Sequence, residues 1–305
     1  MRLIFRAMAC AILVLGLMWT CGRPATAGPA QEMLPEQSAA KAKQLLQQVI
    51  AALGGQAYLN VRDSECTGQI KDFTVSVGSV ADYTDFREQW LFPDKNRVEY
   101  HIKGEHPNIL GLILGSEDPT WFKQDGLVVT VFNGDQGWML NKAGVSNQPE
   151  DLIKNFSEQL KTDMNHVLRM RLREPGVEAR YAGFDLIDLK EVDWIEFDDP
   201  EHHEIRMALD KYTHLPLRWV VATRDPETRE RTEVITSYIQ YLTMDGVKAP
   251  LKLELTRNGR QVTQTFLTEC KYNSNVDPQL FTREALEQSA ARATKKGYKE
   301  SKTAK

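Results

Sequence analysis

Between residues 64 and 283 apolar and polar side chains alternate along most of the chain. Leu251, Leu253 and Leu255, for example, take every second position just before the turn residues Asn258 and Gly259. Side chains of a β-strand point alternately to the two faces of its sheet, so this pattern predicts strands with one buried and one solvated face. Gly, Asn, Asp and Pro between the alternating segments predict tight hairpins. The sequence therefore favours an antiparallel sheet, and binding more than catalysis.

The alternating segments form two groups separated by a helical stretch. The predicted strands are 64–78, 84–92, 97–103, 120–125, 127–132 and 136–140, and then a strand from 178 followed by 184–189, 192–198, 204–210, 215–223, 231–243, 249–257 and 261–272. No segment between the two groups has the composition of a linker. We therefore predict one domain over residues 38–290, preceded by a lead-in at 28–37 and followed by a basic, disordered tail at 291–305.

Apolar residues at helical spacing interrupt the alternation twice. The first helix is predicted to begin at Ser38 as N-cap and to end at Gly54-Gly55. The second follows Pro149, with a stripe formed by Leu152, Ile153, Phe156, Leu160, Met164, Val167 and Leu168. A short helix is expected after Phe281. An amphipathic helix has to bury its apolar stripe, and the sheet is the surface available for this.

The first 27 residues have the order of a secretory signal peptide. Arg2 and Arg6 precede an apolar run that ends at Trp19, and Ala25-Thr26-Ala27 provides small residues for cleavage. The run is shorter than the roughly 20 apolar residues of a membrane span. Cys21 offers an alternative, lipid attachment to a new N-terminal cysteine, but the residues before it are bulky. We therefore predict cleavage near Ala27, a mature chain without a membrane span, and a periplasmic location.

Two cysteines, Cys66 and Cys270, remain after removal of the leader. In an oxidising compartment they can pair, and closing so long a loop stabilises by up to about 5 kcal/mol in the entropic model. The alternative is two buried thiols that act as small apolar side chains. Spacing alone does not decide between a disulfide and two thiols.

The charge distribution bears on the choice of partner. The formal charge is −4, and removal of the three leader arginines leaves −7 for the mature chain. The basic residues gather in the tail from 291 to 305, where six lysines and arginines stand against Glu300. An acidic body argues against nucleic acid as the partner.

Several turn motifs occur together along the chain. They are Ala51-Ala52-Leu53-Gly54-Gly55, Pro93-Asp94-Lys95-Asn96-Arg97, Phe132-Asn133-Gly134-Asp135-Gln136-Gly137-Trp138, Leu209-Asp210-Lys211-Tyr212-Thr213-His214-Leu215-Pro216, Met244-Asp245-Gly246-Val247-Lys248-Ala249-Pro250 and Val276-Asp277-Pro278-Gln279-Leu280-Phe281. This series resembles the bacterial superfamily of periplasmic lipoprotein-localisation carriers and outer-membrane lipoprotein-sorting proteins. The resemblance covers most of the mature chain.

The resemblance implies a fold and a function. The fold is a mainly β, curved antiparallel half-barrel, an open barrel with helices packed on its concave face and an apolar cavity. The implied function is binding or carriage of a hydrophobic ligand, a lipoprotein acyl chain or a lipid. The alternative is a non-catalytic interaction module with a filled core that serves cell-envelope assembly or sensing through a protein partner.

Two groups of residues are candidates for contact with a hydrophobic ligand. The segment from Asn108 to Gly115 is almost wholly apolar and is either a mobile lip, with Ile109, Leu110, Leu112 and Ile113 toward the ligand, or part of the core. Among the aromatic residues, Trp90, Tyr100 and Trp219 each continue an alternating apolar face and are candidates for a cavity wall. We expect a helix at 150–170, or the apolar segment, to move aside for the ligand.

A further candidate is the cluster of carboxylates and imidazoles around Pro200. Asp198-Asp199 precedes Glu201-His202-His203-Glu204, a composition that suggests a metal site. Adjacent residues of a strand point to opposite faces, so a solvated polar turn without a metal is the favoured interpretation. The chain has no G-x-S-x-G, no Walker lysine, no C-x-x-C and no G-x-G-x-x-G. We therefore predict no enzyme activity and no cofactor.

Overall fold

The computed structural model describes residues 33–73, 83–102, 105–107, 121–123, 126–224 and 229–291. Contacts divide the chain into residues 1–34 and a compact unit from Pro35 onward, and the fold described below is that of the second unit. In the described residues, no helix is long and apolar enough to cross a membrane.

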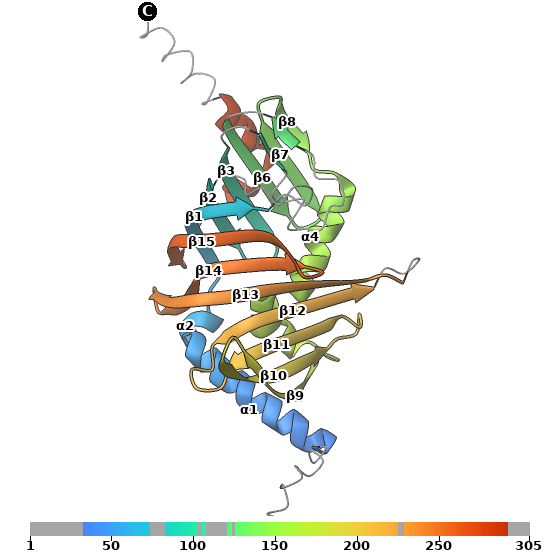
Figure 1. Ribbon diagram of the computed structural model, residues 1–305. Helices are drawn as coiled ribbons and strands as arrows, with labels where there is room; N and C mark the ends of the chain where they lie inside the picture. Colours follow the sequence, from blue (N-terminus) through green and yellow to red (C-terminus); the bar gives the residue numbers. More distant parts are fainter. Residues whose placement is uncertain are drawn as a thin grey trace, which may run out of the picture. The chain divides into compact units, whose positions relative to one another are not determined.

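In the described residues the predicted antiparallel sheet is present and has thirteen strands (Figure 1). Its order is β8-β7-β6-β3-β2-β1-β15-β14-β13-β12-β11-β10-β9. The sheet does not close, because β8 and β9 are both edges, and it forms the mainly β open half-barrel that the sequence predicts. Its strands are β1 Asp63–Asp72, β2 Thr84–Leu91, β3 Lys95–Ile102, β6 Gly126–Asn133, β7 Gln136–Asn141, β8 Gly144–Asn147, β9 Glu178–Ile187, β10 Lys190–Asp198, β11 Glu204–Asp210, β12 Pro216–Arg224, β13 Arg231–Met244, β14 Val247–Arg257 and β15 Arg260–Tyr272.

Most predicted strands are found within a few residues of their expected ends. The short edge strand β8, where only four residues pair, was not predicted from the sequence. A separate two-stranded sheet pairs β4 (Glu105–Pro107) with β5 (Trp121–Lys123). The expected lip at 108–115 lies outside the described residues.

The strands that come first and last in the sequence, β1 and β15, pair with each other in the middle of the sheet. Cys66 lies opposite Cys270 in this ladder, and the two form a disulfide rather than a pair of free thiols. The register shifts directly after Thr67, at a bulge that brings Gly68 close to the neighbouring strand. A Cβ at residue 68 would lie 2.1 Å from the Phe266 carbonyl oxygen, so only glycine fits there without a backbone shift.

Helix α1 (Pro35–Leu53) packs on β9 and β14 and buries one stripe, with Leu45, Val49 and Leu53 in the core. It begins at Pro35, so the prediction of Ser38 as its N-cap is wrong. Ser38 lies inside the helix, and its hydroxyl donates to the carbonyl of Tyr181. Proline suits a first helical turn because its missing N–H has no partner there in any case. The helix ends at Gly54-Gly55 as predicted, and α2 (Gln56–Leu59) follows.

The second helical stretch links the two edges of the sheet. Residues 148–177, here called the crossover, leave β8 at one edge and enter β9 at the other. The prediction of one continuous helix is wrong, because α4 (Glu150–Thr162) stops at Asp163 and α5 (Met164–Arg169) and η1 (Arg171–Arg173) follow. Asp163 has an extended backbone, and its side chain accepts from the His166 N–H, so it acts as N-cap of α5.

The predicted C-terminal helix is also present, as a turn η2 (Pro278–Phe281) followed by helical residues 283–291. Phe281 and Leu286 pack on Val129 and Val131 of β6, whereas the alternate residue Phe132 packs with Phe156 of α4. Strand β6 is therefore covered on both faces, which explains its almost continuous apolar sequence.

Candidate functional site

Cross-strand pairs define the concave face of the sheet. Directly opposite residues of adjacent strands share a face, and one row crosses eight strands from β9 to β1. The row consists of Tyr181, Ile195, Met207, Trp219, Thr236, Leu255, Thr263 and Asp72. A parallel row consists of Tyr238, Leu253, Thr265, Ile70 and Thr84. Trp90 and Tyr100 continue the same face on β2 and β3, with Tyr100 opposite Phe86.

The structure thus places the three predicted aromatic residues on one face but does not bring them together. Trp219 is 3% exposed, and its indole N–H donates to the Thr162 carbonyl at 2.8 Å. Trp90 stacks on Phe156 of α4. Both tryptophans therefore contact the crossover, while Tyr100 lies in a different cluster. The candidates Ile109, Leu110, Leu112 and Ile113 lie outside the described residues.

One part of the concave face is filled by helices. Residues of α1, α2 and α5 pack with β10 to β14 in the largest core cluster, which includes Val49, Tyr58, Leu168 and Trp219. A second cluster joins Tyr100 to Ile70, Phe86, Val98, Ile102 and Val128. Every buried member of this second cluster comes from the sheet, and no described helix contributes to it.

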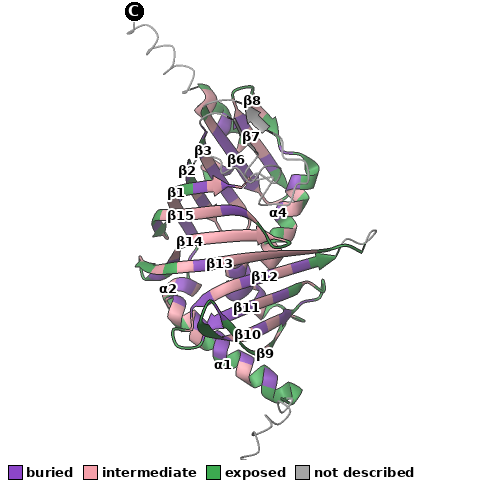
Figure 2. Ribbon diagram, viewed as in Figure 1, coloured by how far each residue is buried: buried purple, intermediate pink, exposed green. Residues whose placement is uncertain are grey.

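A half-buried stretch of sheet lies between the two clusters. Figure 2 shows that most residues of β13, β14 and β15 are intermediate in burial (pink), between more buried strands on both sides. Leu253 and Leu267 are half-buried, Leu253 against the first cluster and Leu267 against the second. Leu253, Leu255 and Leu267, beside the buried Ile70 and Phe86, form an apolar concave surface that we call the leucine wall. Apolar area left in water costs about 25 cal/mol per Å², so this surface favours an apolar occupant.

Polar atoms without partners adjoin the leucine wall. Asp72 has 0% exposure and Thr84 1%, and neither side chain has a hydrogen-bond partner in the described part of the chain. Asp72 lies opposite Thr263, and Thr84 lies opposite Ile70. Burial raises the pKa of Asp72 from 3.8 to about 7. Sequence reasoning missed these residues, although the alternation through Ile70 and Asp72 already puts a carboxyl on the apolar face.

His166 anchors the crossover to the turn between β2 and β3. Its Nδ1 lies 2.8 Å from Asp163 Oδ1 and its Nε2 lies 2.6 Å from the Pro93 carbonyl oxygen. Both partners only accept, so the ring makes both bonds as an imidazolium. Burial lowers the pKa of His166, but the bonds to Asp163 and Pro93 outweigh burial and raise the pKa overall.

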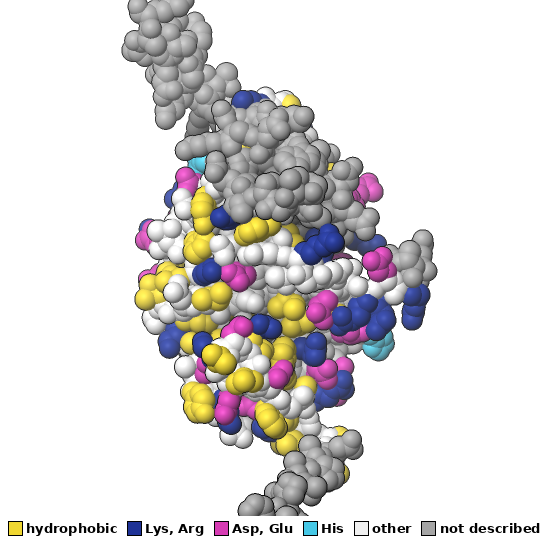
Figure 3. All heavy atoms as spheres, viewed as in Figure 1, with side chains coloured by type: hydrophobic (Ala, Val, Ile, Leu, Met, Phe, Trp, Pro, Cys, Tyr) yellow, Lys and Arg dark blue, Asp and Glu magenta, His cyan; other side chains and the backbone are white. Residues whose placement is uncertain are grey.

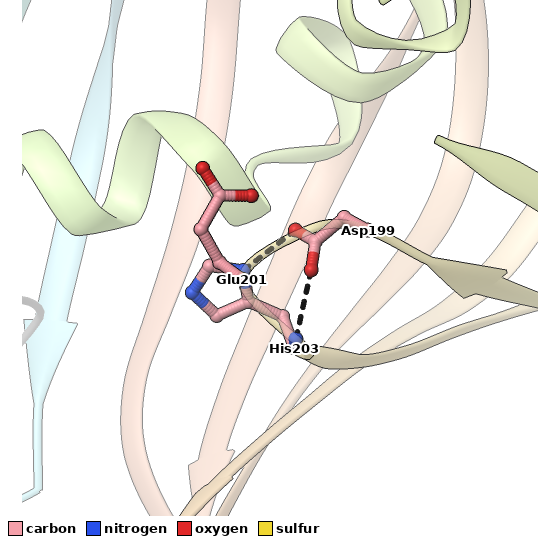
Figure 4. A group of neighbouring side chains, drawn as sticks. All are labelled: Asp199, Glu201 and His203. Carbon is pink, nitrogen blue, oxygen red and sulfur yellow. Dashed lines mark hydrogen bonds and ion pairs between the residues drawn. The ribbon is translucent and has the colours of Figure 1, made fainter. Parts of the chain in front are cut away.

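A second anchor joins the crossover to the turn between β10 and β11. The Arg171 guanidinium lies 2.9 Å from Asp199 and 2.8 Å from Glu201, and His203 Nδ1 lies 2.6 Å from Asp199 (Figure 4). Asp199 is 5% exposed, so the expectation of a solvated turn is wrong at this residue. Burial raises the pKa of Asp199, but the bonds from His203 and Arg171 prevail and hold the pKa below its ordinary value.

Asp199, Glu201 and His203 have the donor atoms of a metal site, all within 4.8 Å of one another. The arginine already supplies the positive charge that the two carboxylates require, and it donates to both. A cation would have to displace Arg171 to bind there. The arrangement is therefore suited to hold the crossover on the sheet. An open pocket of about 320 Å³ beside it is lined largely by charged residues, including Lys161, Arg171, Glu174 and Glu201.

Known proteins resemble this chain at the level of structure. Solved structures similar to it include a DUF1329 family protein from Desulfovibrio piger (10% identity, TM-score 0.49, covering 80% of this chain and 98% of that one). They also include a putative outer membrane lipoprotein-sorting protein domain from Vibrio parahaemolyticus (12%, 0.49, 82% and 99%) and a LolA superfamily protein from Nitrosomonas europaea (9%, 0.49, 80% and 99%). No family model and no curated protein matches the sequence.

These likenesses, with identities of 12% or less and TM-scores of 0.49, do not identify a ligand for this chain.

Proposed function

We propose that the protein binds a hydrophobic or amphipathic ligand, a lipoprotein acyl chain or a lipid, on the concave face of its half-barrel. The observation that carries the proposal is the leucine wall. Its residues come from neighbouring strands and face the same side. Leu253, Leu255 and Leu267 on β14 and β15 are only half-buried, and no described helix contributes to the cluster that Leu267 packs against. A concave apolar surface with a few polar groups is the usual form of a small-molecule site.

The proposed mechanism is an exchange of internal packing for ligand, with the crossover as the movable element. The crossover links both edges of the sheet. Its polar attachments are at Trp219, His166 and Arg171, and its apolar stripe packs on the sheet through residues such as Phe156 and Leu168. A ligand would replace part of this apolar packing once the polar attachments are broken. The leader sequence adds the proposal that this binding takes place in the periplasm.

Native mass spectrometry of the mature chain, purified from the periplasm of an expressing cell and followed by lipid extraction, tests the proposal. We expect a co-purifying lipid, or uptake of added fatty acid or lysolipid in a defined stoichiometry. A clean, ligand-free mass without uptake of either probe would overturn it.

An interaction module is the second candidate function, and exposed apolar residues at the β9 edge favour it. Phe184 is 83% exposed, Leu186 59% and Leu189 92%, all in or next to the hairpin of β9 and β10. Figure 3 shows apolar side chains among charged ones over these lower strands. A protein partner that covers this edge would protect the hairpin from hydrogen exchange. A lipid inside the half-barrel would instead protect β14 and β15.

A further inference from the structure

Buried polar atoms beside the leucine wall lack hydrogen-bond partners in the described part of the chain. Asp72 Oδ1, Asp72 Oδ2 and Thr84 Oγ1 are three buried oxygen atoms without a donor in the described part of the chain. Asp72 and Ile70 are two residues apart on β1, and Thr84 lies opposite Ile70, so Asp72 and Thr84 are diagonal neighbours on one face. Diagonal pairs lie about 7–8 Å apart, close enough for one small group to reach both.

A buried carboxyl without a partner requires a cation or a proton. Among the described residues no lysine, arginine or histidine forms an ion pair with Asp72, and burial is the cause of its raised pKa. The neighbouring Lys71 points to the other face, where its ammonium lies over the Tyr83 ring at 4.9 Å. The protein thus provides acceptors at this position and leaves the donor to another molecule.

Apolar residues of the leucine wall lie in the same cross-strand rows as Asp72 and Thr84. Asp72 lies opposite Thr263, which lies opposite Leu255, and Thr84 lies in the row of Ile70 and Leu253. A chain that covers the leucine wall therefore ends beside these oxygens. Both residues also lie at one end of the sheet, where β1 ends and β2 begins.

We propose that the ligand is an amphiphile with a primary ammonium head, whose three N–H groups bind the Asp72 carboxylate and the Thr84 hydroxyl oxygen while its alkyl chain covers the leucine wall. This inference rests on the proposed function and makes it specific. An ammonium matches the site in charge, since the carboxylate is not otherwise neutralised, and in the number of donors, since three acceptors are free.

The test compares three lysophospholipids with the same acyl chain, bearing ethanolamine, choline or glycerol. Ethanolamine carries the ammonium, choline carries the charge without N–H donors, and glycerol offers O–H donors next to the phosphate. At pH 8 we expect the wild type to bind the ethanolamine lipid at least about tenfold more tightly than the other two, since charge-assisted hydrogen bonds are lost with either of them. At pH 5, where Asp72 is protonated, the preference should disappear.

The variants separate the site from the fold. Asp72→Asn should remove the preference for ethanolamine over choline and glycerol, and Thr84→Val should weaken that preference by about threefold. Asp85→Asn makes the same change of charge on the other face of β2, where Asp85 accepts from Gln69, and should keep the preference. If Asp72→Asn fails to fold, Thr84→Val and the pH comparison on the wild type decide.

Each negative result has its own meaning. Equal wild-type affinity for the three lipids, or a preference that survives in Asp72→Asn, would overturn the ammonium head and leave lipid binding intact. Failure of the wild type to bind any of the three lipids would overturn the proposed function together with this inference.

Discussion

Asp72 makes the stability of the folded chain depend on pH. Its pKa rises from 3.8 to about 7 because the carboxyl is fully buried, so between these pH values the native state holds a proton that the unfolded state has released. Stability therefore falls as pH rises from about 4 to about 7, by about 4 kcal/mol in total from this group.

Asp72→Asn, which cannot ionise, should lack this loss of stability. In urea unfolding, we expect the free energy of unfolding of Asp72→Asn to rise relative to that of the wild type between pH 5 and pH 8. The free energy of unfolding of Asp85→Asn should follow that of the wild type. Parallel pH profiles of wild type and Asp72→Asn would show that the Asp72 carboxyl is solvated.

His166 also makes stability fall as pH rises, through hydrogen bonds that need a charged ring. Its pKa is raised above 6.5, so the stability from its two hydrogen bonds is fully present below pH 6.5 and is lost as pH rises through the folded pKa. Removal of the ring in His166→Gln should cost about 2 kcal/mol at pH 6, because it breaks the bond to the Pro93 carbonyl and the ion pair with the half-buried Asp163. Urea unfolding at pH 6 and pH 9 measures this, and a cost equal at both values would contradict a charged imidazole.

At the scale of the elements, the crossover is held by Arg171 at its C-terminal end. Arg171→Gln leaves Asp199 buried next to Glu201 without a full counter-charge, and we expect a loss of about 3 kcal/mol. Hydrogen exchange should rise in α4 and α5 before it rises in the sheet. Arg173→Gln, an equal change of charge at an exposed residue of η1, is the control. Uniform destabilisation without faster exchange in α4 would show that the anchor is not local.

The elements themselves were largely predictable, because they follow from local patterns. Strand β14 follows the alternation of Leu251 to Leu255, and α1 ends at its glycine pair. The break at Asp163 was missed, since an aspartate between two apolar stripes is compatible with a continuous helix until its capping bond is seen. The candidate site was less predictable. Asp72 and Leu255 are brought into one row by pairing between distant strands, and a local pattern carries no information on that register.

At the scale of the whole molecule, one covalent bond joins the two ends of the strand region. Cys66 and Cys270 are separated by 204 residues, and opening such a loop should lower the free energy of unfolding by up to about 5 kcal/mol in the entropic model. The variant with alanine at both positions, compared with wild type in urea with and without reductant, measures this loss. Reductant should lower the free energy of unfolding of the wild type and leave that of the variant unchanged. An equal response of both proteins would mean that the disulfide contributes nothing to stability.

The pairing of β1 with β15 gives the molecule the connectivity of a ring. Starting at β1, the chain runs out to one edge at β8, returns over the crossover to the other edge at β9, and arrives at β15 beside its own starting strand. A protease that cuts once within the crossover would therefore release neither half. The two fragments would stay joined by a full strand ladder, by the packing of Phe281 on β6 and by a sulfur–sulfur bond. They would migrate as one species on a denaturing gel until a thiol is added, and as two bands afterwards.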